Sequence, residues 1–90
     1  MPDDLRVLCV DDDTDSAHRT AEYLRAAGMT CPVAASGEEA IERLDESVVD
    51  CVVSEYDIPG MDGLELLETV RDRDERLPFI MFTGQGSESV

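Results

Sequence analysis

The side chains with the clearest chemical potential stand where short apolar segments end. They are four acids and one hydroxyl group at three segment ends: Asp11, Asp12, Asp13, Glu55 and Thr83. Carboxylates in one small pocket repel each other, by about 3 kcal/mol for two unit charges roughly 5 Å apart at an effective dielectric of about 20. A proton or a cation must therefore neutralise such a cluster. A few hard oxygen ligands with room for water suit Mg²⁺.

The segments that carry these residues read as buried strands with helices between them. Apolar, β-branched runs predict strands at residues 5–10, 29–34, 51–55 and 77–83. Thr14, Asp15 and Ser16 are candidate caps for a first helix, and Gly28 is a plausible stop. Strands that alternate with helices imply a parallel sheet, right-handed crossovers and helices on both faces.

Two further helices have capping signals at their starts. Ser36 followed three residues later by Glu39 has the capping-box pattern, and Asp62 with Glu65 has the equivalent spacing. We expect the inward faces of these helices to comprise Ala40, Ile41, Leu44 and Val48 in one and Leu64, Leu67 and Val70 in the other.

The order of the strands decides whether the polar side chains meet. Pro32 cannot donate a hydrogen bond to a neighbouring strand, so its strand belongs at an edge. Ligands of open parallel sheets bind beyond the carboxyl ends of the strands. If the first and third strands are neighbours, Asp11, Asp12 and Glu55 converge there. A bound Mg²⁺ would attract a phosphoryl group, to which Thr83 would offer a hydroxyl donor.

Composition narrows the function class. The chain has 90 residues, enough for one small domain. It has 22 acidic residues against 7 basic ones, all Arg, and a formal net charge of −15. So negative a surface repels nucleic acid and anionic lipid, and no apolar run approaches the roughly 20 residues of a membrane span. We therefore expect a cytoplasmic protein of a halophilic, haloarchaeal-like source that binds neither nucleic acid nor membrane through this segment.

Three stretches resemble response regulator receiver domains of two-component signal transduction, the chemotaxis-receiver-like family. Residues 7–13 resemble the first strand and its acidic pair, residues 50–63 the third strand and following loop, and residues 78–84 the fourth strand. The loop Ile-Pro-Gly-Met-Asp-Gly at 58–63, at this distance from the acidic pair, is the specific element. The resemblance covers the whole chain.

The resemblance implies a flavodoxin-like, three-layer α/β/α fold with a parallel sheet in the order 2-1-3-4. It implies that Asp12 binds Mg²⁺ directly, Asp11 binds it through water, and the backbone carbonyl of Asp57 is a further ligand. Position 55 would accept phosphate from a sensor histidine kinase, and Thr83 would reorient toward it. The chain would be a signalling module, not an enzyme, that regulates a downstream output domain or protein.

The sequence departs from the family pattern in two respects. Glu55 stands where the family has the phosphate-accepting Asp, and its extra methylene moves the carboxylate by roughly 1.5 Å, which matters for in-line attack. The chain also lacks the later strand that carries a Lys, so residues 1–90 are expected to form a receiver domain incomplete at its C-terminal side. The fourth strand would then have an uncovered edge that favours dimer contacts.

Three alternatives stay open. A receiver-like module that only docks partners, without phosphorylation, agrees with Glu55 and the absent Lys. Asp11, Asp13, Asp15 and Glu22 partly match a calcium-binding EF-hand loop, but Ser16 replaces its glycine. A phosphatase with a nucleophilic Asp would need Thr or Val at position 15 in place of Asp15.

Overall fold

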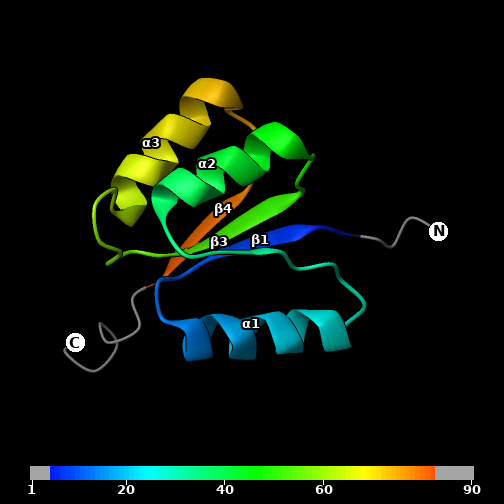
Figure 1. Cartoon of the computed structure of the whole chain (residues 1–90). Coiled ribbons are helices and arrows are strands. Elements are labelled where there is room, and N and C mark those ends of the chain that lie inside the picture. The colour runs from blue at the N-terminus through cyan, green and yellow to red at the C-terminus, as the bar shows by residue number, and fades with distance from the viewer. Residues whose placement is uncertain (1–4, 83–90) are drawn as a thin grey trace.

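The computed structural model describes residues 5–82, which form one parallel four-stranded sheet with helices on both faces (Figure 1). The elements are β1 (Val7–Val10), α1 (Thr14–Ala26), β2 (Val33–Ala34), α2 (Gly37–Glu46), β3 (Cys51–Glu55), α3 (Gly63–Arg73) and β4 (Phe79–Phe82). The strand order is β2-β1-β3-β4. The predicted flavodoxin-like three-layer fold is therefore confirmed.

The central strands β1 and β3 pair in parallel, from Val7 with Cys51 to Val10 with Ser54. The strand that follows Pro32 lies at an edge of the sheet, as predicted, but β2 is only two residues long. The preceding residues still bond to the neighbouring chain, since the Cys9 amide donates to the Pro32 carbonyl at 2.9 Å. Because proline has no N–H of its own, the regular ladder is restricted to Val33 and Ala34.

Residues of β1 alternate between two cores of different size. Leu8 and Val10 face α2 and α3, where the larger core contains nine buried residues. Cys9 faces α1, where the buried cluster comprises only Cys9, Ala21 and Cys31. Figure 1 shows α1 alone on its face of the described sheet and α2 beside α3 on the other. The two layers are thus unequal in buried apolar volume.

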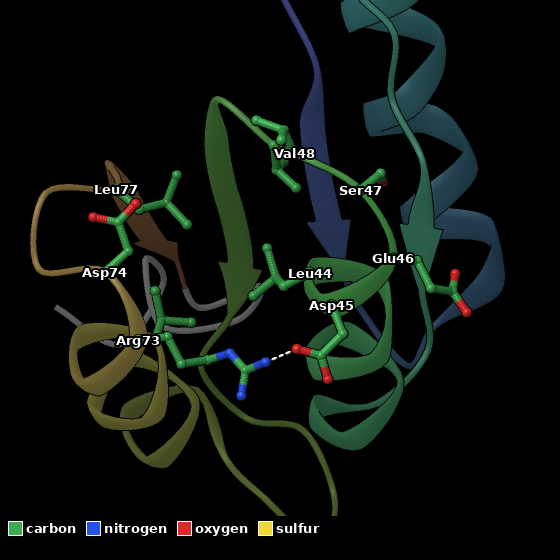
Figure 2. A pocket seen from close by; sticks show the side chains of 10 residues that line it. Leu44, Asp45, Glu46, Ser47, Val48, Arg73, Asp74 and Leu77 are labelled. Atoms are coloured by element: carbon green, nitrogen blue, oxygen red, sulfur yellow. Dashed lines mark ion pairs between the residues drawn. The ribbon is translucent and has the colours of Figure 1, made fainter.

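The helices α2 and α3 pack beside each other and are joined by an ion pair between Arg73 and Asp45 (Figure 2). The inward side of α3 agrees with our prediction at Val70, which is buried, but not at Leu64, which is 47% exposed. Leu66 is buried, and the predicted Leu67 is half-buried. Helical spacing fits both sets of apolar positions, and the docking of α3 on the sheet buries Leu66 and Val70.

Val48 is a second difference, because the helix that was expected to include it stops earlier. Ser47 caps α2 in an extended conformation, and Val48 follows it at 83% exposure. Val49 is buried in its place. In an extended segment successive side chains point to opposite sides, so Val49 is buried although its neighbour Val48 is exposed. Helical periodicity does not describe this alternation.

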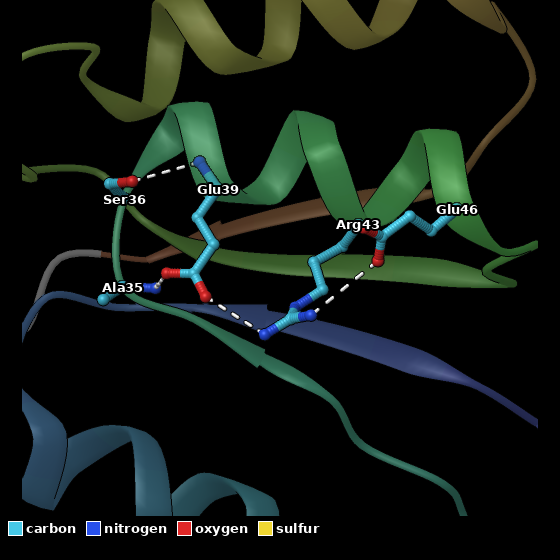
Figure 3. A network of polar contacts seen from close by, with 5 residues as sticks. All are labelled: Ala35, Ser36, Glu39, Arg43 and Glu46. Atoms are coloured by element: carbon cyan, nitrogen blue, oxygen red, sulfur yellow. Dashed lines mark hydrogen bonds and ion pairs between the residues drawn. The ribbon is translucent and has the colours of Figure 1, made fainter.

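The start of α2 combines a cap with a side-chain network (Figure 3). The Ser36 hydroxyl accepts from the Glu39 amide at 3.1 Å, as predicted. The Glu39 carboxylate, however, accepts from the Ala35 amide and not from the Ser36 amide, so the full capping box is absent. Its other oxygen accepts from Arg43 at 3.1 Å, and Arg43 also lies 3.9 Å from Glu46.

The other two helix starts test the remaining capping predictions. The N-cap of α1 is Asp13, whose carboxylate accepts from the amides of Asp15 and Ser16, so the predicted candidates lie one to three positions too late. The capping box of α3 is confirmed, with Asp62 and Glu65 each accepting from the other's amide. Gly28 follows the end of α1 with a φ of 94°, as expected for a helix stop.

Within residues 5–82, no helix is both long enough and apolar enough to cross a lipid bilayer.

Candidate functional site

The carboxyl ends of β1 and β3 bring two acids to neighbouring positions. Asp11 and Glu55 each follow the last registered pair of these strands, Val10 with Ser54. Both acids are buried, Asp11 at 3% and Glu55 at 8% exposure. The prediction that the first and third strands are neighbours is therefore correct, and two carboxylates lie at the same edge of the sheet.

Asp11 is held by its backbone and by one of its two carboxylate oxygens. Its amide donates to the Ala34 carbonyl at 3.0 Å, which fixes the end of β1 against β2. Its Oδ1 accepts from the Asp13 amide at 2.9 Å. Its Oδ2 is buried and has no hydrogen-bond partner among the described residues. A buried, unpartnered anionic oxygen is unfavourable by itself, which makes this atom the best candidate for contact with a cation.

Glu55 is positioned by close packing of the backbone around it. It pairs with Phe82 across the sheet, and the Ser54 hydroxyl donates to its carbonyl at 3.0 Å. A β-carbon at Gly63 would lie 2.8 Å from the same carbonyl oxygen and 2.8 Å from the Tyr56 Cα. Only glycine therefore allows the start of α3 to approach the end of β3 this closely.

The loop between β3 and α3 is tied at both ends. The Tyr56 amide donates to the Phe82 carbonyl at 2.7 Å, and the Gly63 amide donates to the Tyr56 carbonyl at 2.8 Å. Ile58 is 3% exposed and anchors the loop in the larger core. Gly60 has a φ of 83°, a conformation that other residues rarely adopt. These constraints place Asp57 in an exposed turn beside the acidic edge.

The predicted metal ligands are the side chains of Asp11, Asp12 and Glu55 and the backbone carbonyl of Asp57, and these residues differ in exposure. Asp12 and Asp57 are exposed, whereas Asp11 and Glu55 are buried. Over residues 5–82, no group of three or more His, Cys, Asp or Glu side chains is arranged to hold a metal ion. Mg²⁺ binding by this set stays a prediction. Thr83, the predicted switch residue, lies outside the described residues.

The calcium-loop alternative does not agree with the fold. An EF-hand loop lies between two helices, but Asp11 follows the strand β1. Glu22 lies far along the continuous helix α1, past its midpoint. The acids at this spacing therefore belong to a strand end and a helix, and not to a calcium loop.

Two positioning residues were not singled out by sequence reasoning. Ser54 and Gly63 contact the Glu55 backbone. The feature of the sequence that could have identified them is a small residue close to the acid at the end of a strand. Cys9 also lies near this edge: burial raises the pKa of its thiol from 9.0 to about 12, and Cys31 and Asp11 shift it in the same direction. The buried thiol thus stays protonated and adds no charge near Asp11.

Comparison with known proteins agrees with this geometry. Residues 7–90 match the family described as response regulator receiver domain. The transcriptional regulator NtrC of Escherichia coli is 38% identical over 78 residues, covering 87% of this chain and 17% of NtrC. The sensor histidine kinase RcsC of Salmonella typhimurium is 32% identical over 82 residues, covering 91% of this chain and 9% of RcsC. The chain thus spans a small part of the length of these relatives.

A solved structure extends the likeness to three dimensions. The response regulator TrrA of Thermotoga maritima, in complex with Mg²⁺-BeF, superposes with a TM-score of 0.87 at 28% identity, covering 92% of this chain and 72% of that one. Sequence family, strand order and the acidic strand ends all agree. The chain therefore belongs to the response regulator receiver domains.

Proposed function

We propose that this chain is the receiver of a two-component phosphorelay that binds Mg²⁺ at the acidic edge and regulates a partner or output domain, and that Glu55 prevents efficient phosphorylation. The observation that carries the proposal is the buried Asp11 with its unpartnered Oδ2, on the strand next to the one that ends in Glu55.

The residues present fit a divalent cation in part. The unpartnered Asp11 Oδ2 offers one anionic oxygen at a buried position, and Asp12 is an exposed carboxylate adjacent in sequence that can turn toward it. The Asp57 carbonyl is a further candidate ligand. A bound Mg²⁺ would supply positive charge that offsets carboxylate repulsion and attracts a phosphoryl group. The TrrA complex with Mg²⁺-BeF supports this assignment for the family fold.

Glu55 is the residue that we expect to limit phosphoryl transfer. Its backbone is fixed by the Ser54 hydroxyl and by close packing against Gly63, so the backbone cannot withdraw to compensate for a longer side chain. A carboxylate displaced by roughly 1.5 Å is poorly placed for in-line attack on a phosphorus atom. Burial at 8% exposure also limits the space into which the extra methylene can turn.

The partners follow from the kind of module. The relatives NtrC and RcsC are a transcriptional regulator and a sensor histidine kinase. We infer that this receiver takes its input from a sensor histidine kinase and passes it to an output domain or protein. The second candidate function is a pseudo-receiver that docks partners without phosphorylation, and the Glu at position 55 is the observation that favours it.

The test combines Mg²⁺ titration with phosphorylation. Mg²⁺ should raise the unfolding free energy of the wild-type chain by about 1.4 kcal/mol at ten times its Kd, and should not stabilise Asp11→Asn. Incubation with acetyl phosphate and Mg²⁺ should leave the intact mass of the wild type unchanged. Glu55→Asp should instead gain about 80 Da, one phosphoryl group.

Each alternative gives a different result. A stable adduct on wild-type Glu55 would show that the longer side chain is a competent acceptor. Mg²⁺ binding without phosphorylation of either variant would favour the pseudo-receiver. No stabilisation by Mg²⁺ at any concentration would overturn the metal site and with it the proposed chemistry.

A further inference from the structure

A cavity lies at the opposite edge of the sheet from Asp11 and Glu55. It has a volume of about 390 Å³ and opens between the C-terminal ends of α2 and α3. Its wall comes from two segments that precede strands, residues 44–49 before β3 and residues 70–77 before β4. It therefore shares no residue with the acidic edge and does not depend on receiver chemistry.

The interior of this cavity is apolar and its rim is polar. The apolar lining residues are Leu44, Val48, Val49, Val70 and Leu77. Val48 is 83% exposed, so one apolar wall reaches the surface. A volume of this size with an apolar interior and a few polar groups is typical of sites for small organic molecules.

A cationic side chain of the protein itself, Arg73, already occupies the rim. The Arg73 guanidinium from α3 reaches across the mouth to the Asp45 carboxylate of α2 (Figure 2). Both side chains are substantially exposed, at 41% and 56%. An exposed pair of this kind contributes little to stability and exchanges readily with other partners. Asp45 is therefore an acceptor that a second cation can reach.

Other charges near the rim also favour a cation. Asp74 lines the cavity and caps the end of α3, and the last turns of α2 and α3 both point their carbonyl oxygens toward this edge. Arg71 opposes this charge from outside the lining, since it donates to the carbonyls of Asp74 and Leu77. The net charge of −15 for the chain adds long-range attraction for cations and repulsion for anions.

We propose that the cavity between α2 and α3 is a binding site for a small amphipathic cation, with its apolar body between Leu44, Val48 and Leu77 and its ammonium or guanidinium group on Asp45. The ligand's charged group takes the place of the Arg73 guanidinium. Arg73 thus acts as an internal competitor that lowers the affinity for external cations.

The probes for the test are three molecules with one phenylethyl skeleton: 2-phenylethylamine, 2-phenylethanol and 3-phenylpropanoate. Binding is followed on the full chain by methyl and amide NMR spectra, at the lowest salt concentration that keeps the spectra dispersed. We expect the amine to shift the signals of Val48, Val49, Val70 and Leu77, the alcohol to bind at least threefold more weakly, and the carboxylate to cause no shift.

Variants at the rim test the role of charge separately from the cavity. Arg73→Gln should tighten amine binding by about three- to tenfold, because the competing guanidinium is lost, and Asp45→Asn should weaken it by a similar factor. Matched changes on α1 that alter the net charge equally, Arg19→Gln and Glu22→Gln, should leave the affinity within twofold of the wild type.

The amide spectrum of each variant shows directly whether it is folded. Equal affinity for all three probes would show that the cavity does not select cations. Preference for the carboxylate would show that the ligand's charged group binds Arg73 and not Asp45, which would also overturn the proposal. Shifts spread over α1, or no shifts at the cavity, would overturn the site itself.

Discussion

The close approach of α3 to β3 gives a sharp test of how the acidic edge is built. Gly63 and Gly37 both occupy the first helical position, of α3 and α2 respectively. A β-carbon at Gly63 would meet backbone atoms of Glu55 and Tyr56 at 2.8 Å. A β-carbon at Gly37 would lie 2.8 Å from the Met61 Sδ, which can turn away, and 2.9 Å from the Met61 Cβ, which moves only with its loop. The same substitution thus meets the backbone at a strand end in one helix and a side chain of the following loop in the other.

The expected cost of Gly63→Ala follows from these contacts. Ordinary van der Waals contact begins at about 3.4 Å, so two backbone atoms must move by about 0.6 Å or α3 must shift, and overpacking of this kind costs about 1–3 kcal/mol. The gain from replacing glycine by alanine in a helix offsets at most about 1 kcal/mol. We expect a net loss of about 2 kcal/mol for Gly63→Ala and a smaller loss for Gly37→Ala, because the loop that carries Met61 can yield more than the paired end of β3.

Urea denaturation followed by circular dichroism measures both variants. At a slope of about 1 kcal/mol per M for a domain of this size, the midpoint of Gly63→Ala should fall by about 2 M and that of Gly37→Ala by less. The amide NMR spectrum of Gly63→Ala should also change most at Glu55 and Tyr56. If Gly63→Ala is as stable as the wild type, or if Gly37→Ala loses more stability than Gly63→Ala, the claim that backbone packing positions Glu55 is wrong.

Four other measurements test separate features of the chain. Asp11→Asn should raise the unfolding free energy by about 1–2 kcal/mol in Mg²⁺-free buffer, because a buried charge close to Glu55 is removed; a loss of stability would contradict the account of its unpartnered oxygen. The denaturation midpoint should rise between 0.1 and 1 M KCl, as the Debye length falls from about 10 to about 3 Å and self-repulsion of the −15 charge is screened; a midpoint independent of salt would argue against a halophilic protein. Iodoacetamide at pH 8 should label the partly exposed Cys51 before the buried Cys9. Because the folded pKa of Cys9 is raised from 9.0 to about 12, the stability linked to its protonated thiol is complete below pH 9 and lost as the pH rises toward 12; Cys9→Ala should reduce that alkaline loss, and an unchanged pH profile would refute the burial argument.

The sequence predicted the layers well because apolar patterning and caps act locally. Apolar runs marked all four strands, Pro32 marked an edge, and the Asp62–Glu65 spacing marked the start of α3. These signals depend on neighbours a few residues apart, which a single sequence shows directly.

The differences arose where tertiary packing chooses between equivalent local patterns. Leu64 and Leu66 both fit a helical face, and only the docking of α3 on the sheet decides that Leu66 is buried. Asp13, Thr14, Asp15 and Ser16 can all cap a helix, and the tight turn after Asp11 selects Asp13.

The site shows the same division between local signals and three-dimensional contacts. Strand ends brought Asp11 and Glu55 to adjacent positions, as the pattern suggested. The exposed side chains of Asp12 and Asp57 depend on loop rotamers that no periodicity encodes. The approach of Gly63 to the Glu55 carbonyl depends on the distance between two elements, which the sequence does not state.

The unequal layers on the two faces of the sheet have a consequence for motion. The buried residues of α1 are two small side chains, Ala17 and Ala21, Leu24 is partly buried, and the cluster beneath the helix holds two thiols. Two hydrogen bonds tie its last turn to the segment before β2, from Arg25 to the Cys31 carbonyl at 2.9 Å and from the Met29 amide to the Leu24 carbonyl at 3.0 Å. Opening of α1 therefore exposes less apolar surface than opening of α2 or α3, and its amide protons should exchange with solvent deuterium first. Among the helices of residues 5–82 we expect α1 to be the least protected, and it begins three residues after Asp11, so its slow fluctuations would reach the acidic edge without unfolding the rest.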